Sequence, residues 1–105
     1  MKLRVALAQI NPTVGDLAGN AALITKYTDE AVAASADVIV FPEMVLTGYP
    51  VEDLALRASF RSASKSALAQ LVGSLDPSIV SVIGYLDESA TGAPQNRVEI
   101  GRAHV

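Results

Sequence analysis

The residue of this sequence whose type and position best suit catalysis is a single acid, Glu43. It follows Pro42 at the end of a short apolar run, residues 38–41 (VIVF), and a Gly-Tyr-Pro turn follows at residues 48–50. A strand that stops abruptly and presents a carboxylate at its carboxyl end is typical of active sites in open α/β sheets. Such a carboxylate could act as a general base. The alternative is an exposed acid stabilised by backbone N–H groups in the first turn after the strand.

The neighbouring polar residues do not complete a catalytic set with Glu43. Glu52 and Asp53 are expected to be surface acids or to begin a helix. The serines of residues 58–66 lack a Gly-x-Ser-x-Gly pattern and a histidine partner, so we expect them on a helix face. No glycine-rich phosphate-binding loop occurs, which argues against ATP or NAD binding within these residues.

Composition excludes several classes of protein. The chain has 105 residues, of which 50% are hydrophobic and 18% charged, so we expect one small folded domain. The net charge of −3 and the lack of a basic cluster argue against nucleic acid or an anionic membrane as a partner. No apolar run approaches the roughly 18 residues of a membrane span, and we expect no secretory signal.

Cysteine is absent from the sequence. This excludes a disulfide framework, a zinc–thiolate site and a cysteine nucleophile within these residues. A reduced, cytoplasmic compartment fits such a composition, and we expect no metal site.

The spacing of apolar residues predicts an α/β fold. Residues 3–10 are apolar on both faces, which favours a buried strand in a parallel sheet. Apolar residues recur at three- and four-residue steps over residues 20–35 and predict a helix, which Asp16 or Asn20 could cap. Residues 37–42 predict a second strand, so the three elements form a βαβ unit with parallel strands and a right-handed crossover.

The second half of the chain continues this alternation. Residues 53–57 could form a short helical turn, and residues 60–75 carry a second helical stripe that an Asp-Pro pair ends. Residues 79–86 predict a third strand. Residues 87–96 contain glycine and proline and are expected to form a loop or hairpin turn.

Three segments, in order, resemble a known family. Residues 3–20 (LRVALAQINPTVGDLAGN) resemble the start of the nitrilase, or carbon–nitrogen hydrolase, superfamily. Residues 41–49 (FPEMVLTGY) resemble the motif that carries its catalytic glutamate, and residues 48–54 (GYPVEDL) look like the glutaminase domain of glutamine-dependent NAD synthetases. The resemblance covers residues 3–98. It implies a truncated α-β-β-α sandwich, of which this chain holds the N-terminal βαβ unit, a further helix and a further strand of the sheet.

The resemblance also implies a role for Glu43. In that family a glutamate deprotonates a cysteine thiol, the thiol attacks the side-chain amide of glutamine, and a lysine stabilises the oxyanion. Only the glutamate carries over, as Glu43, because the lysine and cysteine motifs lie in later segments that this chain does not contain. We therefore expect residues 1–105 alone to be inactive. Tyr49 would lie beside the glutamine pocket, with its hydroxyl on the substrate or its ring packed under the loop.

Further partners are implied outside this chain. Ammonia released from L-glutamine would pass to a C-terminal synthetase domain that uses ATP, Mg²⁺ and deamido-NAD to form NAD, and the full-length protein would be a homo-oligomer. No cofactor is expected within these residues. Two alternatives stay open: a superfamily amidase that acts on another amide, such as an ω-amidase or aliphatic amidase, and a non-catalytic α/β module.

The end of the chain looks foreign to that family. Residues 100–105 (IGRAHV) back-translate onto a widely used sequencing-adapter sequence. We therefore expect a partial carbon–nitrogen hydrolase (glutaminase) domain over residues 1–99 and a non-native tail over residues 100–105. That tail would contain Arg102 and His104, the only histidine. The alternative is a genuine terminus.

Overall fold

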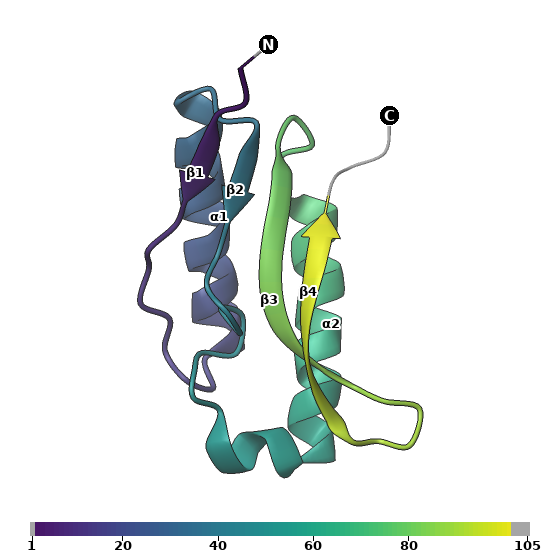
Figure 1. The fold of residues 1–105 in the computed structure, drawn as a ribbon. Helices are drawn as coiled ribbons and strands as arrows, with labels where there is room; N and C mark the ends of the chain where they lie inside the picture. Colours follow the sequence, from purple (N-terminus) through teal and green to yellow (C-terminus); the bar gives the residue numbers. More distant parts are fainter. Residues whose placement is uncertain (1, 102–105) are drawn as a thin grey trace.

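A four-stranded sheet carries two helices on one of its faces (Figure 1). The computed structural model describes residues 2–101. Its elements are β1 (Val5–Leu7), α1 (Leu17–Ala33), β2 (Val38–Val40), the short 3-10 helix η1 (Glu52–Leu56), α2 (Ala58–Ser74), β3 (Val80–Glu88) and β4 (Pro94–Gly101). The first three strands are parallel, and β4 is antiparallel to β3. The predicted α/β class and the parallel βαβ unit are therefore confirmed.

The start of α1 and the ends of both long helices have identifiable local causes. The Asp16 carboxylate accepts a hydrogen bond from the Gly19 N–H at 3.0 Å, so Asp16 is the N-cap and α1 starts earlier than predicted. Its C-terminal end is marked by Ser35, whose φ of 62° is left-handed. The second helix ends at Ser74, before an Asp-Pro pair that disfavours helical backbone.

The core lies between the sheet and the helices. Ile39 of β2 and Ile83 of β3 are buried in one cluster with Ile24 of α1 and Leu71 of α2. Each fully buried isoleucine contributes about 2 kcal/mol by leaving water. Because side chains alternate across a strand, the neighbours of Ile39 and Ile83 along each strand point to the opposite face.

That opposite face of the sheet is apolar and largely uncovered within residues 2–101. Leu7, Val40, Val82 and Ile100 are consecutive register partners across all four strands, and we call them the apolar row. The side chains at its two ends are 70% (Leu7) and 69% (Ile100) exposed. Helices therefore bury only one side of this sheet in the described part of the chain.

The first strand differs from its prediction. It spans three residues instead of residues 3–10, and it pairs only with β2, so it is an edge strand. Leu3 is 69% exposed, and Val5 and Leu7 are also exposed. The prediction that this strand is buried on both faces is therefore wrong for residues 2–101. Burial of its second face would need a further layer of structure, and residues 2–101 do not contain that layer.

After β3 the chain forms a hairpin with an additional strand that the sequence does not predict. The turn expected within residues 87–96 is present: the Ser89 N–H donates to the Ala93 carbonyl at 2.8 Å, and Gly92 takes a φ of 86°. The strand β4 that follows is not among the predicted strands: its first residues, Pro94 to Arg97, are polar or proline, and the alternation of polar and apolar residues begins only at Arg97. Ile100 and Gly101 lie in β4 opposite Val82 and Ser81, whereas Arg102 and His104 lie outside the described residues.

Neither long helix within residues 2–101 has the length and apolar character needed to cross a membrane.

Candidate functional site

Glu43 lies just beyond the carboxyl end of β2, as the sequence predicts. The chain first continues beside β3, where the Phe41 N–H donates to the Val82 carbonyl at 3.0 Å. Phe41, Met44 and Val45 are buried, whereas Glu43 is exposed. The apolar residues around Glu43 therefore anchor the loop in the core and leave the carboxylate at the surface.

The loop that carries Glu43 sits directly on β3 at Gly84. The Leu46 N–H donates to the Gly84 carbonyl at 3.3 Å. A Cβ atom added to Gly84 would lie 2.5 Å from the Met44 nitrogen and 2.9 Å from the Pro42 carbonyl oxygen. Only glycine permits this approach. Met44 has a left-handed φ of 49°, a strained conformation for a side chain of its size, and it turns the chain immediately after Glu43.

A second support comes from the turn between β1 and α1, through the buried side chain of Asn20. Its Oδ1 accepts from the Thr13 N–H at 2.8 Å, and its Nδ2 donates to the Thr13 carbonyl at 2.8 Å and the Leu46 carbonyl at 2.9 Å. Asn20 is therefore not the helix cap that the sequence left open. It joins the segments that follow β1 and β2.

Close backbone packing reinforces that junction. The Gly15 N–H donates to the Thr47 carbonyl at 2.8 Å. Gly48 has a φ of 80°, and a Cβ there would lie 2.6 Å from the Cα of Val14. The two loops at the carboxyl ends of β1 and β2 are therefore packed together and hydrogen-bonded to each other.

The side chain of Glu43 has a partner that sequence reasoning missed. Asn96 of β4 donates a hydrogen bond from its Nδ2 to the Glu43 Oε1, across a separation of 53 residues. No local pattern predicts this contact, because the glycine and proline content of residues 87–96 predicts a loop or hairpin turn.

The remaining candidates lie apart from this contact. Tyr49 is 63% exposed, so its ring is not packed under the loop in the described part of the chain. Its contact with a substrate stays a prediction. Glu52 and Asp53 are exposed in the first turn of η1, which confirms the surface position expected for them. Ser64 is buried on α2 and donates to the Leu86 carbonyl at 2.9 Å, a structural role.

The lysines of α1 and α2 also lie elsewhere. Lys26 of α1 lies 5.3 Å from the ring centroid of Tyr27, and Lys65 of α2 lies 3.9 Å from a carboxylate oxygen of Glu88. Within residues 2–101, no three acidic or histidine side chains gather closely enough to hold a metal ion. Glu43 therefore stays the candidate base among the described residues, and neither lysine pairs with it there.

A buried acid, Asp87, occupies the other face of the hairpin. Burial alone would raise its pKa, but hydrogen bonds from the Glu88 N–H and the Tyr85 hydroxyl outweigh that effect, so the pKa of Asp87 lies below its ordinary value. The charges of Arg97 and Lys65 act in the same direction. Burial, with the hydrogen bond to Asp87, raises the pKa of Tyr85.

Arg61 connects three elements next to this acid. Its Nε donates to Glu88 Oε2 at 2.9 Å, and its Nη1 donates to the Ala55 carbonyl at 2.9 Å. Arg61 is itself buried, with 8% of its surface exposed. It therefore ties η1, which follows the loop bearing Glu43 and Tyr49, to both α2 and β3.

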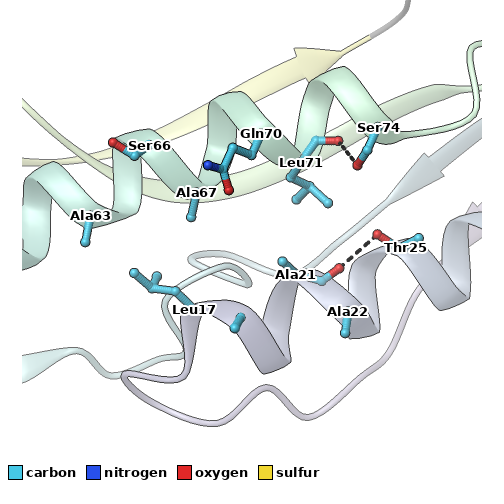
Figure 2. Close-up of a pocket in the computed structure, with 11 residues that line it drawn as sticks. Leu17, Ala21, Ala22, Thr25, Ala63, Ser66, Ala67, Gln70, Leu71 and Ser74 are labelled. Carbon is cyan, nitrogen blue, oxygen red and sulfur yellow. Dashed lines mark hydrogen bonds between the residues drawn. The ribbon is translucent and has the colours of Figure 1, made fainter.

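A groove of about 620 Å³ runs between α1 and α2. Figure 2 shows small side chains on both walls, with Ala67 and Leu71 of α2 facing Leu17 and Ala21 of α1. The groove belongs to the helix layer. Glu43 and Asn96 do not line it.

Comparison with known proteins identifies similar sequences. A sequence model described as carbon-nitrogen hydrolase matches residues 4–99. A glutamine-dependent NAD(+) synthetase of Acinetobacter baylyi is 35% identical over 97 residues, which cover 92% of this chain and 18% of that protein. Its counterpart in Synechocystis sp. is 41% identical over 80 residues, which cover 76% of this chain and 14% of that protein.

Solved structures show the same relation. Glutamine-dependent NAD+ synthetase from Acinetobacter baumannii, in complex with ADP, matches with a TM-score of 0.87 and 33% identity over 95% of this chain and 19% of its own. An amidase from Nesterenkonia sp. matches with a TM-score of 0.69 and 20% identity over 93% of this chain and 38% of its own, and so shares the fold. This chain spans less than a fifth of the length of the synthetases it matches.

Proposed function

Because the chain belongs to the carbon–nitrogen hydrolase family, we propose that it forms part of the glutaminase domain of a glutamine-dependent NAD synthetase, with Glu43 as the general base. One observation carries the proposal. Glu43 is the exposed carboxylate at the carboxyl end of β2, inside the matched segment, on a loop whose backbone Gly84 and Asn20 hold in place.

Glu43 would act twice in the reaction. It takes the proton of a cysteine thiol from a segment outside this chain, and the thiolate attacks the side-chain carbonyl carbon of L-glutamine. The proton is returned to the departing ammonia as the thioester forms. Glu43 then deprotonates the water that cleaves the thioester to glutamate. A lysine outside this chain would stabilise the oxyanion in both steps.

The remaining partners belong to the same proposal. A synthetase domain outside this chain would use the ammonia with ATP, Mg²⁺ and deamido-NAD to form NAD, in a cytoplasmic homo-oligomer. In this proposal Mg²⁺ would be held by that other domain. Tyr49, exposed on the loop of Glu43, would hold the polar end of glutamine.

The test compares two nitrogen sources in the full-length protein that carries this sequence. Glu43→Gln should lower glutamine-driven NAD formation by roughly a hundredfold or more, the usual contribution of a general base. Ammonia-driven formation should stay unchanged, because ammonia bypasses the glutaminase step. Glu52→Gln, an exposed acid on η1, is the matched control and should leave both rates intact.

Two outcomes would contradict the proposal. Full glutamine-driven activity in Glu43→Gln would show that this residue is not the base and would favour the non-catalytic module. Hydrolysis of other amides without any NAD formation would favour an amidase of the same family.

A further inference from the structure

We propose that Asn96 is a positioning residue for Glu43: its side-chain amide holds one carboxylate oxygen and so directs the other toward the reacting thiol. The inference rests on the proposed function of Glu43. It starts from the hydrogen bond that Asn96 Nδ2 donates to Glu43 Oε1.

The topology places both side chains on the same face of the sheet. Glu99 lines a hollow with Leu68 and Val72 of α2, and a Cβ added to Gly101 would lie 3.5 Å from Val72 Cγ1. These residues of β4 therefore face the helices. Since side chains alternate along a strand, Asn96 points to the opposite face, where Glu43 lies.

The backbone of Glu43 is already fixed by a separate contact. Gly84 on β3 receives the loop so closely that a methyl group would not fit there. Its register partner on β4 is Val98, and Asn96 is the next residue of β4 on the same face. The main chain of Glu43 therefore rests on β3, and its side chain reaches across to β4. With the backbone of Glu43 held in this way, its side chain can still rotate, and the hydrogen bond from Asn96 restricts that rotation.

The chemistry of the Asn96–Glu43 pair leaves Glu43 free to accept a proton. An ionised carboxylate only accepts hydrogen bonds, so the amide of Asn96 must present its N–H₂ group and not its oxygen. A hydrogen bond to a charged acceptor is stronger than one between neutral groups. The amide carries no net charge and does not titrate, so it orients the carboxylate without competing for the proton. The second oxygen of Glu43 is left for catalysis.

The test measures ammonia release from glutamine in the full-length protein. Asn96→Ala should lower kcat roughly tenfold to a hundredfold, as expected for a misplaced catalytic group, with KM changed less than about twofold. Asn96→Asp should lower kcat at least as much, because a second carboxylate repels Glu43. Asn96→Gln keeps a donor and should recover part of the loss. Gln95→Ala is the control on the same strand: Gln95 accepts from Arg97, two residues away, and points to the other face.

Each outcome decides for or against the proposal. Adding Asn96→Ala to Glu43→Gln should cost no further activity if the two residues act as one unit. Unchanged kcat in Asn96→Ala beside an inactive Glu43→Gln would overturn the positioning role and leave the proposed function standing. A loss confined to KM would also overturn it. Full activity in Glu43→Gln would overturn both. If Asn96→Ala loses ammonia-driven synthesis too and so is not folded, the near-isosteric Asn96→Asp decides in its place.

Discussion

Asp87 illustrates how single residues set the response of this chain to acid. Its pKa is lower in the folded chain than its ordinary value, because the Tyr85 hydroxyl and the Glu88 N–H donate to its charged form. The folded state therefore binds a proton to Asp87 less readily than the unfolded state does. The stability that Asp87 contributes is present above about pH 4 and is lost as the pH falls through the lower folded-state pKa.

We therefore expect Asp87→Asn to weaken the acid sensitivity of the chain. The measurement is the urea midpoint of residues 1–105 in dilute solution, at about pH 6 and about pH 3. The wild-type midpoint should fall more between the two pH values than that of Asp87→Asn. Asp29→Asn, an exposed acid on α1, serves as the control and should behave as wild type. An equal fall in wild type and Asp87→Asn would contradict the assignment.

The position of Glu43 after β2 could be predicted from sequence, whereas its contact with Asn96 could not, for a physical reason. Glu43 belongs to a local pattern in which a strand, a proline and an acid follow one another. Asn96 reaches Glu43 only through the antiparallel pairing of β4 with β3, which sets the face on which Asn96 lies and brings it to a residue 53 positions away in the sequence. Polar residues on an edge strand leave no local trace of that pairing.

Some helices and strands could likewise be predicted from the sequence, and others could not. The helices were predictable because each buries residues at three- and four-residue steps. The limits of β1 were not, since its apolar run is longer than the backbone pairing that β2 offers. The role of Asn20 was equally hidden. The residues around Asn20 are compatible both with a helix cap and with a buried link between two loops. Only the hydrogen bond to the Leu46 carbonyl, which is distant in sequence, shows that Asn20 is the link.

Asn20 should therefore matter more for stability than a helix cap does. Asn20→Ala leaves the Thr13 backbone and the Leu46 carbonyl without their partners, and we expect a loss of roughly 2–4 kcal/mol in the free energy of unfolding. Asn11→Ala changes an exposed asparagine in the same turn and should cost less than about 0.5 kcal/mol. Urea denaturation of both variants provides the measurement. Similar losses in the two would show that Asn20 does not link the loops.

The whole molecule has two unlike sides. Helices α1 and α2 cover one face of the sheet (Figure 1). The apolar row crosses the other face. The α-β-β-α sandwich that the family resemblance implies places a second sheet against such a face. Within residues 2–101 that layer is absent, and the exposed ends of the row sit on the two edge strands. Large apolar patches and open strand edges both promote association.

Residues 1–105 alone should therefore associate as their concentration rises, and the apolar row should be the cause. Replacing Leu7 and Ile100 together by threonine keeps strand propensity but removes apolar surface, so the average mass measured by light scattering should fall toward that of the monomer. Leu56→Thr is the matched control, because Leu56 on η1 is 72% exposed but lies off the row. A monomeric wild type with a sharp cooperative melt would contradict the expectation. An equal fall in mass for Leu56→Thr would show that general hydrophobicity, and not this face of the sheet, drives association.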